Sequence, residues 1–202
     1  MRRFLLLVWI VLPLILTASD AFSQQLFSTA ETRGFGTPSV LVGFSFIRQD
    51  ADQGEDFTQI TARAGIGIGR KTDIFGSFDG ILGSDVLNTK FLAWSAGIKH
   101  QFIRTHIVDV GGIARIRGNR TSESRFEDAL MDFAGIISID AAAFHPYYAI
   151  MFSRPFGLSL SDKFQRTNVF GAEVPIGDIP RVIGEISVGD RRSFGLALEL
   201  AF

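Results

Sequence analysis

Ser193-Phe194-Gly195-Leu196-Ala197-Leu198-Glu199-Leu200-Ala201-Phe202 is the stretch of this sequence that decides the fold. Apolar side chains occupy every second position, and small or polar side chains fill the positions between them. A period of two over ten residues predicts one β-strand with an apolar side and a small or polar side. Ten residues is also about the length of a tilted strand that crosses a bilayer.

The apolar side of this strand is a row of alternate residues that ends on an aromatic one: Phe194, Leu196, Leu198, Leu200 and Phe202. In this respect the stretch resembles the C-terminal strand of bacterial outer-membrane β-barrel proteins. In those families the barrel assembly machinery reads this strand as a signal, so the resemblance implies that role here. Residues 29–37 and 67–76 also resemble many uncharacterised outer-membrane barrels of this size, without pointing to a single family.

The beginning of the sequence has the form of a secretory signal. Arg2 and Arg3 precede an apolar run over residues 4–16, and residues 17–23 supply a cleavage site that ends at Ser23. A membrane anchor is the alternative, but Pro13 interrupts a run already shorter than the roughly 20 residues of a spanning helix. We therefore expect residues 1–23 to be a signal peptide, cleaved near Ser23 after export through the inner membrane.

Composition limits what the exported chain can be. Removal of 23 residues from 202 leaves 179, and the basic residues fall from 20 to 18 and the acidic residues from 21 to 20. A net charge near −2 excludes a nucleic-acid-binding protein, which needs a strongly basic face. Cysteine is absent, which excludes disulfides and thiolate metal sites. No later stretch has 18 consecutive apolar residues, so membrane insertion requires strands that close into a barrel.

Segments of alternating polarity recur along the rest of the chain and predict ten strands. They cover Pro38–Arg48, Phe57–Gly69, Asp73–Leu82, Lys90–Phe102, Ile107–Arg117, Met131–Asp140, Phe144–Ser153, Thr167–Val174, Arg181–Gly189 and the terminal stretch. Residues 154–166 could extend a strand or form a long loop. Short links alternate with longer polar ones, except for a short link at 190–192 where a long one is due.

This alternation is typical of outer-membrane barrels, in which the turns are periplasmic and the loops lie outside. Residues 38–202 are therefore predicted to form an all-β, antiparallel up-and-down transmembrane β-barrel of about ten strands, with eight as the alternative. Residues 24–37 are expected to be an N-terminal leader that runs into the first strand. The predicted lipid face includes Val42, Phe44, Ile60, Ile66, Phe78, Trp94, Ile98, Val110, Phe133, Ile150, Ile186, Leu196 and Leu198.

Charged side chains on the opposite face are expected to line the lumen. A turn over residues 70–72 places Arg63 opposite Asp79, and a turn centred on Arg104 places Lys99 opposite Asp109. Enclosed charges need partners, because an unpaired buried charge is costly. We therefore predict a salt-bridged lumen, with a structural or gating role, that plugs or narrows the pore. Its members are Arg63, Asp79, Lys99, Asp109, Arg115, Arg117, Glu173, Glu185 and Glu199.

Two motifs suggest other chemistry. The glycines of 65–69 mimic a nucleotide-binding loop, but they lie inside a predicted strand and no helix follows, so interior packing is the better interpretation. Lipid-modifying barrel enzymes use a histidine in the outer half with a serine and an acidic residue. Here His100, His106 and His145 all flank predicted periplasmic turns, so we expect no catalytic residues, no metal site and no cofactor.

The sequence thus predicts a non-enzymatic, porin-like protein of the Gram-negative outer membrane, either structural and surface-exposed or a narrow small-solute channel. A lipid-modifying enzyme, an acyl hydrolase or acyltransferase, is the alternative. A soluble periplasmic β-barrel or sandwich is disfavoured because it would expose rows of Ile, Phe and Val to water. The expected partners are outer-membrane lipid, lipopolysaccharide, the barrel assembly machinery and periplasmic chaperones during transit, with no nucleic acid, and the expected state is a monomer.

Overall fold

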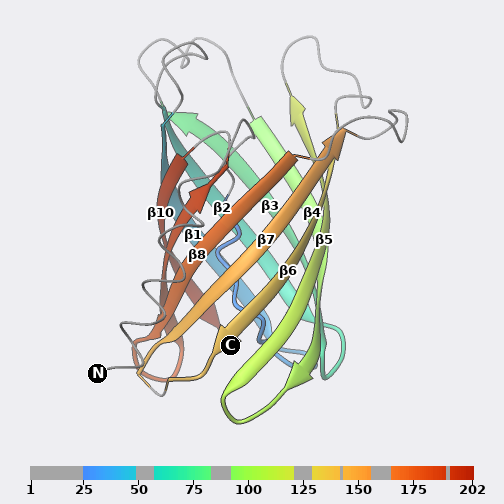
Figure 1. Cartoon of the computed structure of the whole chain (residues 1–202), viewed down its shortest axis with the longest axis vertical. Coiled ribbons are helices and arrows are strands. Elements are labelled where there is room, and N and C mark those ends of the chain that lie inside the picture. Colours follow the sequence, from blue (N-terminus) through green and yellow to red (C-terminus); the bar gives the residue numbers. More distant parts are fainter. Residues whose placement is uncertain are drawn as a thin grey trace.

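The ten predicted strands are present in the computed structural model of the chain (Figure 1). The structure describes residues 25–48, 57–82, 92–120, 129–141, 143–155, 165–189 and 192–202. The expected signal peptide, residues 1–23, lies outside the described residues. So do most residues of the long polar links and residues 156–164, where the sequence left a strand or a loop open.

The strands form one closed antiparallel barrel in which each strand pairs with its neighbours in sequence and β1 pairs with β10. Their bounds are β1 Pro38–Arg48, β2 Phe57–Gly67, β3 Thr72–Leu82, β4 Leu92–Arg104, β5 Val108–Arg120, β6 Leu130–Ile139, β7 His145–Pro155, β8 Gln165–Pro175, β9 Pro180–Val188 and β10 Arg192–Ala201. The predicted up-and-down barrel of ten strands is confirmed, and the alternative of eight strands is wrong. No helix in the described part of the chain is long and apolar enough to cross a membrane.

The two ends of the barrel differ. Short links over residues 68–71, 105–107, 140–144 and 176–179 join strands at one end, which we call the turn end. The other end, which we call the loop end, leads into the longer links that begin after Arg48, Leu82, Arg120 and Pro155. The last residue also lies at the turn end, where the Phe202 amide donates to the Pro38 carbonyl at 3.0 Å.

Apolar side chains cover the outside of the barrel. Exposure alternates along the strands, as in β1, where Val42, Phe44 and Phe46 are about half exposed while Leu41 and Ile47 are buried. All thirteen residues predicted for the lipid face lie on this outer face. The inward and outward faces that were assigned from the sequence are therefore confirmed. Contact of the outer face with lipid is a separate, proposed property.

The predicted pairing of Arg63 with Asp79 is wrong. In the β2–β3 hairpin Arg63 lies opposite Ser77, and Asp79 lies opposite Thr61. The hairpin closes one residue earlier than expected, with Gly67 opposite Asp73 and the Ile68 amide donating to the Thr72 carbonyl at 2.9 Å. When the turn is centred one residue earlier, each residue of β2 pairs with a residue of β3 two positions away from the expected one. The side chains therefore stay on the predicted face of the sheet, but each faces a different cross-strand partner.

The predicted pairing of Lys99 with Asp109 is also wrong. Strand β4 continues to Arg104, which lies opposite Asp109, and a register shift between Gln101 and Ile103 sets Lys99 opposite Ile113. Thr105 holds the tight turn, because its hydroxyl accepts the Val108 amide at 2.8 Å. The extra residue in β4 is a β-bulge, which a symmetric turn model cannot anticipate.

Candidate functional site

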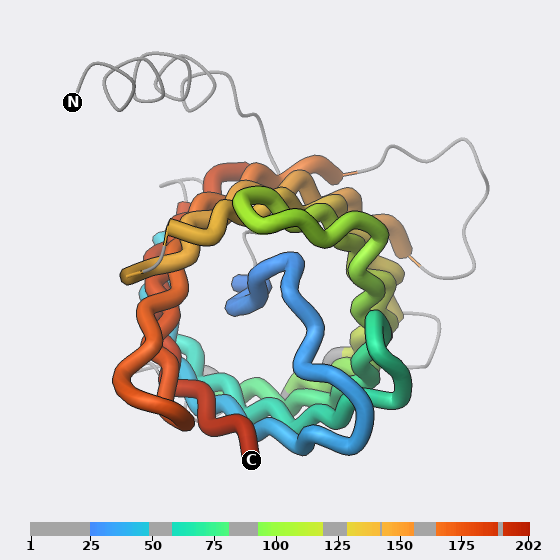
Figure 2. Tube along the Cα trace, turned by 90° about the horizontal axis from the view of Figure 1, so that it is seen from below, coloured from blue at the N-terminus to red at the C-terminus, as the bar shows by residue number. Residues whose placement is uncertain are grey.

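The lumen of the barrel contains a segment of the same chain. Residues 25–37, which we call the luminal segment, lie inside the ring of strands when the barrel is viewed from the turn end (Figure 2). Leu26, Phe27 and Ala30 are 3%, 2% and 0% exposed and belong to the apolar core. The sequence predicted a leader that runs into the first strand, and it did not predict the luminal position of that leader.

The luminal segment runs along the inside of the barrel from the loop end towards the turn end. The Gln25 amide donates to the Ser193 hydroxyl at 2.6 Å, near the loop end of β10. At the turn end the Gly36 amide donates to the Gly67 carbonyl at 2.8 Å. Gly34 and Gly36 have φ angles of 87° and 75°, which allow the chain to reverse there and enter β1 at Pro38.

Gly67 makes room for this segment. A Cβ atom at position 67 would overlap the backbone carbonyl of Gly34, whereas a Cβ at Gly69 would meet no atom within 4 Å. Interior packing therefore explains the glycine at 67, as predicted, and the material packed against it is the luminal segment. The inner face of β2 lacks a side chain here because another backbone needs the space.

The backbone of Leu26 and Phe27 is held by charged side chains of two strands, β9 and β2. The Glu185 carboxylate on β9 accepts the Leu26 amide at 2.5 Å and the Phe27 amide at 2.6 Å. The Arg63 guanidinium on β2 donates to the Leu26 carbonyl at 2.8 Å and to the Phe27 carbonyl at 2.6 Å. Tyr147 on β7 donates its hydroxyl to Glu185 at 2.6 Å. We call Glu185, Arg63 and Tyr147 the upper clamp.

The upper clamp also stabilises an unusual backbone conformation. Phe27 has a φ of 44°, and it is the one residue other than glycine with a positive φ in the described part of the chain. A bulky residue in the left-handed region persists only when its surroundings fix it. Four charge-assisted hydrogen bonds to one dipeptide provide that constraint.

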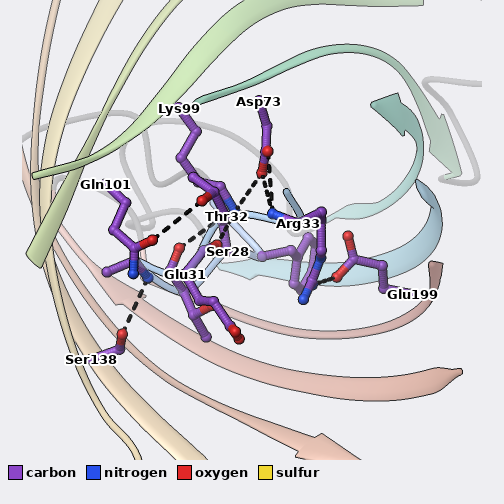
Figure 3. Close-up of polar contacts among 12 residues, drawn as sticks. Ser28, Glu31, Thr32, Arg33, Asp73, Lys99, Gln101, Ser138 and Glu199 are labelled. Carbon is purple, nitrogen blue, oxygen red and sulfur yellow. Dashed lines mark hydrogen bonds and ion pairs between the residues drawn. The ribbon is translucent and has the colours of Figure 1, made fainter. Parts of the chain in front are cut away.

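A second set of contacts holds the segment near the turn end, as shown in Figure 3. The Arg33 amide donates to both oxygens of Asp73 at 3.2 and 3.1 Å, and the Arg33 guanidinium forms ion pairs with Glu199 and Glu173. Lys99 lies 3.4 Å from Asp73 and donates to the Glu31 carbonyl at 2.6 Å. We call Arg33 and its three carboxylate partners the lower clamp.

Further contacts join the segment to the strands between the clamps. The Ala30 amide donates to the Ser138 hydroxyl at 3.3 Å, and the Thr32 hydroxyl contacts the Gln101 side-chain oxygen at 3.2 Å (Figure 3). Arg181 bridges Glu173 of β8 and Glu31 of the segment. The luminal segment is thus attached to strands around the barrel, while the Gln25 side-chain oxygen and the Arg33 Nε and Nη1 atoms are buried without a hydrogen-bond partner among the described residues.

The loop half of the lumen contains a small cavity that is partly lined by arginines. A cavity of about 30 Å³ lies between the upper clamp and the loop-end halves of β2 to β5, with Arg63, Arg115 and Arg117 in its wall. The Asp132 carboxylate accepts from Arg115 at 2.7 Å and from Arg117 at 2.9 Å. A volume of this size holds about two water molecules, so this space is a polar vestibule above the segment.

All nine charged residues that the sequence assigned to the lumen lie on the inner face. Arg115 and Arg117 share Asp132, Glu185 and Arg63 hold Leu26 and Phe27, and Glu173 and Glu199 bind Arg33. Asp79 accepts from Thr61 at 2.5 Å, and Lys99 pairs with Asp73. Asp109 lies at the turn end, one of its oxygens having no hydrogen-bond partner among the described residues. The ion pairs and hydrogen bonds inside the barrel also involve residues that were not predicted from the sequence: Glu31, Arg33, Asp73, Asp132, Tyr147 and Arg181.

The three histidines lie beside the turns as predicted, and His145 is the cross-strand partner of Glu173 in the lower clamp. His100 is exposed at the turn-end half of β4, with Nδ1 2.8 Å from the Thr72 hydroxyl and its ring against Phe102. His106 lies in the β4–β5 turn, and His145 begins β7. Among the described residues, no group of three His, Asp or Glu side chains could hold a metal ion.

Fold and site together define a closed ten-stranded barrel whose lumen contains its own N-terminal segment. No family model and no curated protein matches the chain. Among solved structures it is similar to the KdgM porin, with 10% identity and a TM-score of 0.43 over 82% of this chain and 99% of that one. It is also similar to Ail of Yersinia pestis, with 10% identity, a TM-score of 0.40 and coverage of 83% and 99%. For Omp33 of Acinetobacter baumannii the values are 6%, 0.38, 83% and 98%.

Proposed function

We propose that the chain is an integral outer-membrane β-barrel whose lumen is closed by its own luminal segment, and that it acts as a non-enzymatic scaffold for its surface loops. The lower clamp carries this proposal. One guanidinium, that of Arg33, joins carboxylates of β8 and β10, while its backbone amide binds β3 on the other side of the lumen. A segment held in this way occupies the pathway that a solute would need.

The outer surface of the barrel supports a place in the membrane. Large apolar side chains are exposed on every strand, among them Phe44, Phe78, Phe133 and Leu198. A soluble protein rarely exposes apolar surface this extensively, whereas an outer-membrane barrel requires it. The signal peptide expected over 1–23 and the terminal strand would supply export and recognition by the assembly machinery. In this proposal the turn end is periplasmic, and the protein is a monomer surrounded by outer-membrane lipid and lipopolysaccharide.

A narrow channel is the second candidate, and the polar vestibule favours it. The luminal segment enters β1 at the turn end, and its contacts with the wall are mostly polar, so its release would join the vestibule to the turn end. Such a channel would carry small polar solutes only while the segment is displaced. A lipid-modifying enzyme has less support, since the histidines lie at the turn end, away from the vestibule.

Single-channel recording in a planar bilayer tests the proposal. The full mature chain is compared with a chain that begins at residue 37 and therefore lacks most of the luminal segment. We expect silence from the full chain and steady conductance from the shortened one. Because the shortened chain loses both clamps, an Arg33→Gln variant of the full chain provides a second comparison, with brief openings expected. Steady conductance of the full chain, equal to that of the shortened one, would contradict a closed lumen.

A further inference from the structure

Two neighbouring rows of side chains cross the outer face of β1, β10, β9 and β8 near the loop end. Cross-strand pairing aligns the first row, which is apolar: Phe46, Phe194, Ile186 and Phe170. The next row towards the loop end contains Arg48, Arg192, Val188 and Asn168. The change from aromatic and aliphatic side chains to arginines takes place within one step of the strands, as at the edge of a hydrocarbon layer.

Arg48 and Arg192 are directly opposite each other. They are Cα partners in the β1–β10 ladder, and both side chains are exposed on the outer face. Like charges at directly opposed positions destabilise an antiparallel pair. Neither guanidinium has an ion-pair partner in the described part of the chain, and the described residues of these four strands place no Asp or Glu on the outer face. Among the described residues, the pair therefore has a local excess of positive charge.

A third arginine extends this positive surface. Arg166 lies on the outer face of β8, one step beyond Asn168, and donates to the Asn168 side-chain oxygen at 3.2 Å. Tyr148 donates to the same oxygen at 2.9 Å, and Asn168 is only 5% exposed. This buried amide therefore holds Arg166 against the barrel wall. Strands β8 and β10 are separated by β9, and Arg166 lies two residues beyond the row of Arg192, so the two arginines are about 12 Å apart at the backbone.

We propose that Arg48, Arg192 and Arg166 form a binding site for the phosphate groups of the outer-leaflet glycolipid, lipopolysaccharide. Guanidinium groups bind phosphate oxygens in pairs, and a phosphate between Arg48 and Arg192 would remove their repulsion. A glycolipid headgroup that carries two phosphates can reach both the arginine pair and Arg166, whereas phosphatidylglycerol carries one. The apolar row beneath would contact the acyl chains. This inference rests on the proposed outer-membrane location with the loop end outward.

Native mass spectrometry of the full mature chain, folded in an uncharged detergent, tests the site. The probes are bisphosphorylated lipid A, the same lipid without phosphates, and phosphatidylglycerol, with inorganic phosphate as a competitor. We expect bisphosphorylated lipid A to bind at least about tenfold more tightly than either other lipid. Arg48→Gln with Arg192→Gln should remove about a tenfold factor or more, and the corresponding Lys substitutions should lose less, because they keep the charge.

Arg70→Gln is the matched control, since Arg70 is exposed at the opposite, turn end. Equal affinities for the phosphorylated and dephosphorylated lipids, or an unchanged affinity in the double Gln variant, would overturn the site. Displacement of lipid A by equimolar inorganic phosphate would overturn the glycolipid as ligand. The proposed function is tested separately, because a folded chain shows a heat-modifiable gel band and inserts into vesicles whether or not this site exists. Failure of that insertion would contradict the membrane location itself.

Discussion

At the scale of single residues, Arg33 makes the decisive contacts. It is the cation of the lower clamp, and its side chain is 7% exposed beside Glu199 and Glu173. Arg33→Gln should lower the free energy of unfolding by about 3–5 kcal/mol, because it leaves buried carboxylates without their counter-ion. Urea unfolding in lipid vesicles, followed by tryptophan fluorescence, measures this change.

Arg104→Gln is the matched control for Arg33→Gln. Arg104 also pairs with an acidic residue of the luminal segment, Glu31, but its side chain is 60% exposed. Removal of such a solvent-exposed ion pair should cost about 0–1 kcal/mol. Equal losses in the two variants would mean that the lower clamp contributes no more than a surface ion pair.

Gly67 offers a test of the backbone contact between β2 and the luminal segment. Gly67→Ala puts a methyl group where the Gly34 carbonyl lies, so the segment must shift, and we expect a loss of about 1–3 kcal/mol. The shift should also expose Arg33 to trypsin, which limited proteolysis followed by mass spectrometry detects. Gly69→Ala is the control, because a methyl group there meets no atom within 4 Å. Equal trypsin sensitivity of the two variants would contradict the packing of Gly67 against the segment.

Individual partners were harder to predict from the sequence than individual faces. Arg63 and Lys99 were correctly assigned to the lumen by alternation, yet both received the wrong partner. The face of a residue depends on a period of two, which the sequence displays directly. The cross-strand partner of a residue depends on the geometry of the turn. Arg63 in addition binds backbone carbonyls of residues 26 and 27, and the alternation of polar and apolar residues around Arg63 does not indicate such a contact.

At the scale of the elements, the strands follow the predicted ranges to within two residues at each end because their alternation is regular, except that β5 continues three residues further, to Arg120. The exceptions have local causes. Strand β4 gains a bulge at Gln101 and Ile103, and the β2–β3 turn closes at Gly67. The bulge and the position of the turn both depend on hydrogen bonds made by a few turn residues, such as Thr105. The spacing of apolar residues along the strands does not determine them.

The apolar outer face of β10 allows a direct test of the membrane orientation. Leu198→Arg places a charge on the outer face of this strand, where the cost of folding into lipid should be about 2–4 kcal/mol. Ile107→Arg is the control, because Ile107 lies in the turn between β4 and β5 and should cost about 0–1 kcal/mol. Folding yields into vesicles across a urea series measure both values. An unchanged yield for Leu198→Arg would show that this face does not contact lipid.

At the scale of the whole molecule, a closed barrel could be predicted, but its contents could not. Ten strands of alternating polarity can close into a barrel, in which the first strand pairs with the last and no edge strand is left unpaired. The luminal segment has no period of its own, and its buried residues Leu26, Phe27 and Ala30 are too few to indicate packing. Its place depends on the size and charge of the interior that the ten strands enclose. The alternation of the strands thus predicted charged side chains inside the barrel, but not the segment that they hold there.

The position of the luminal segment is the central claim, and a disulfide tests it most directly in a chain that has no cysteine. Ala30→Cys with Ser138→Cys probes two positions that lie in contact, since the Ala30 amide donates to the Ser138 hydroxyl at 3.3 Å. Ala30→Cys with Ile137→Cys is the matched pair, since Ile137 lies on the outer face of the same strand. After mild oxidation of the folded protein, mass spectrometry should show nearly complete bridging of the first pair and none of the second. An unbridged first pair, with both cysteines free to react with a maleimide, would contradict a luminal position of the segment.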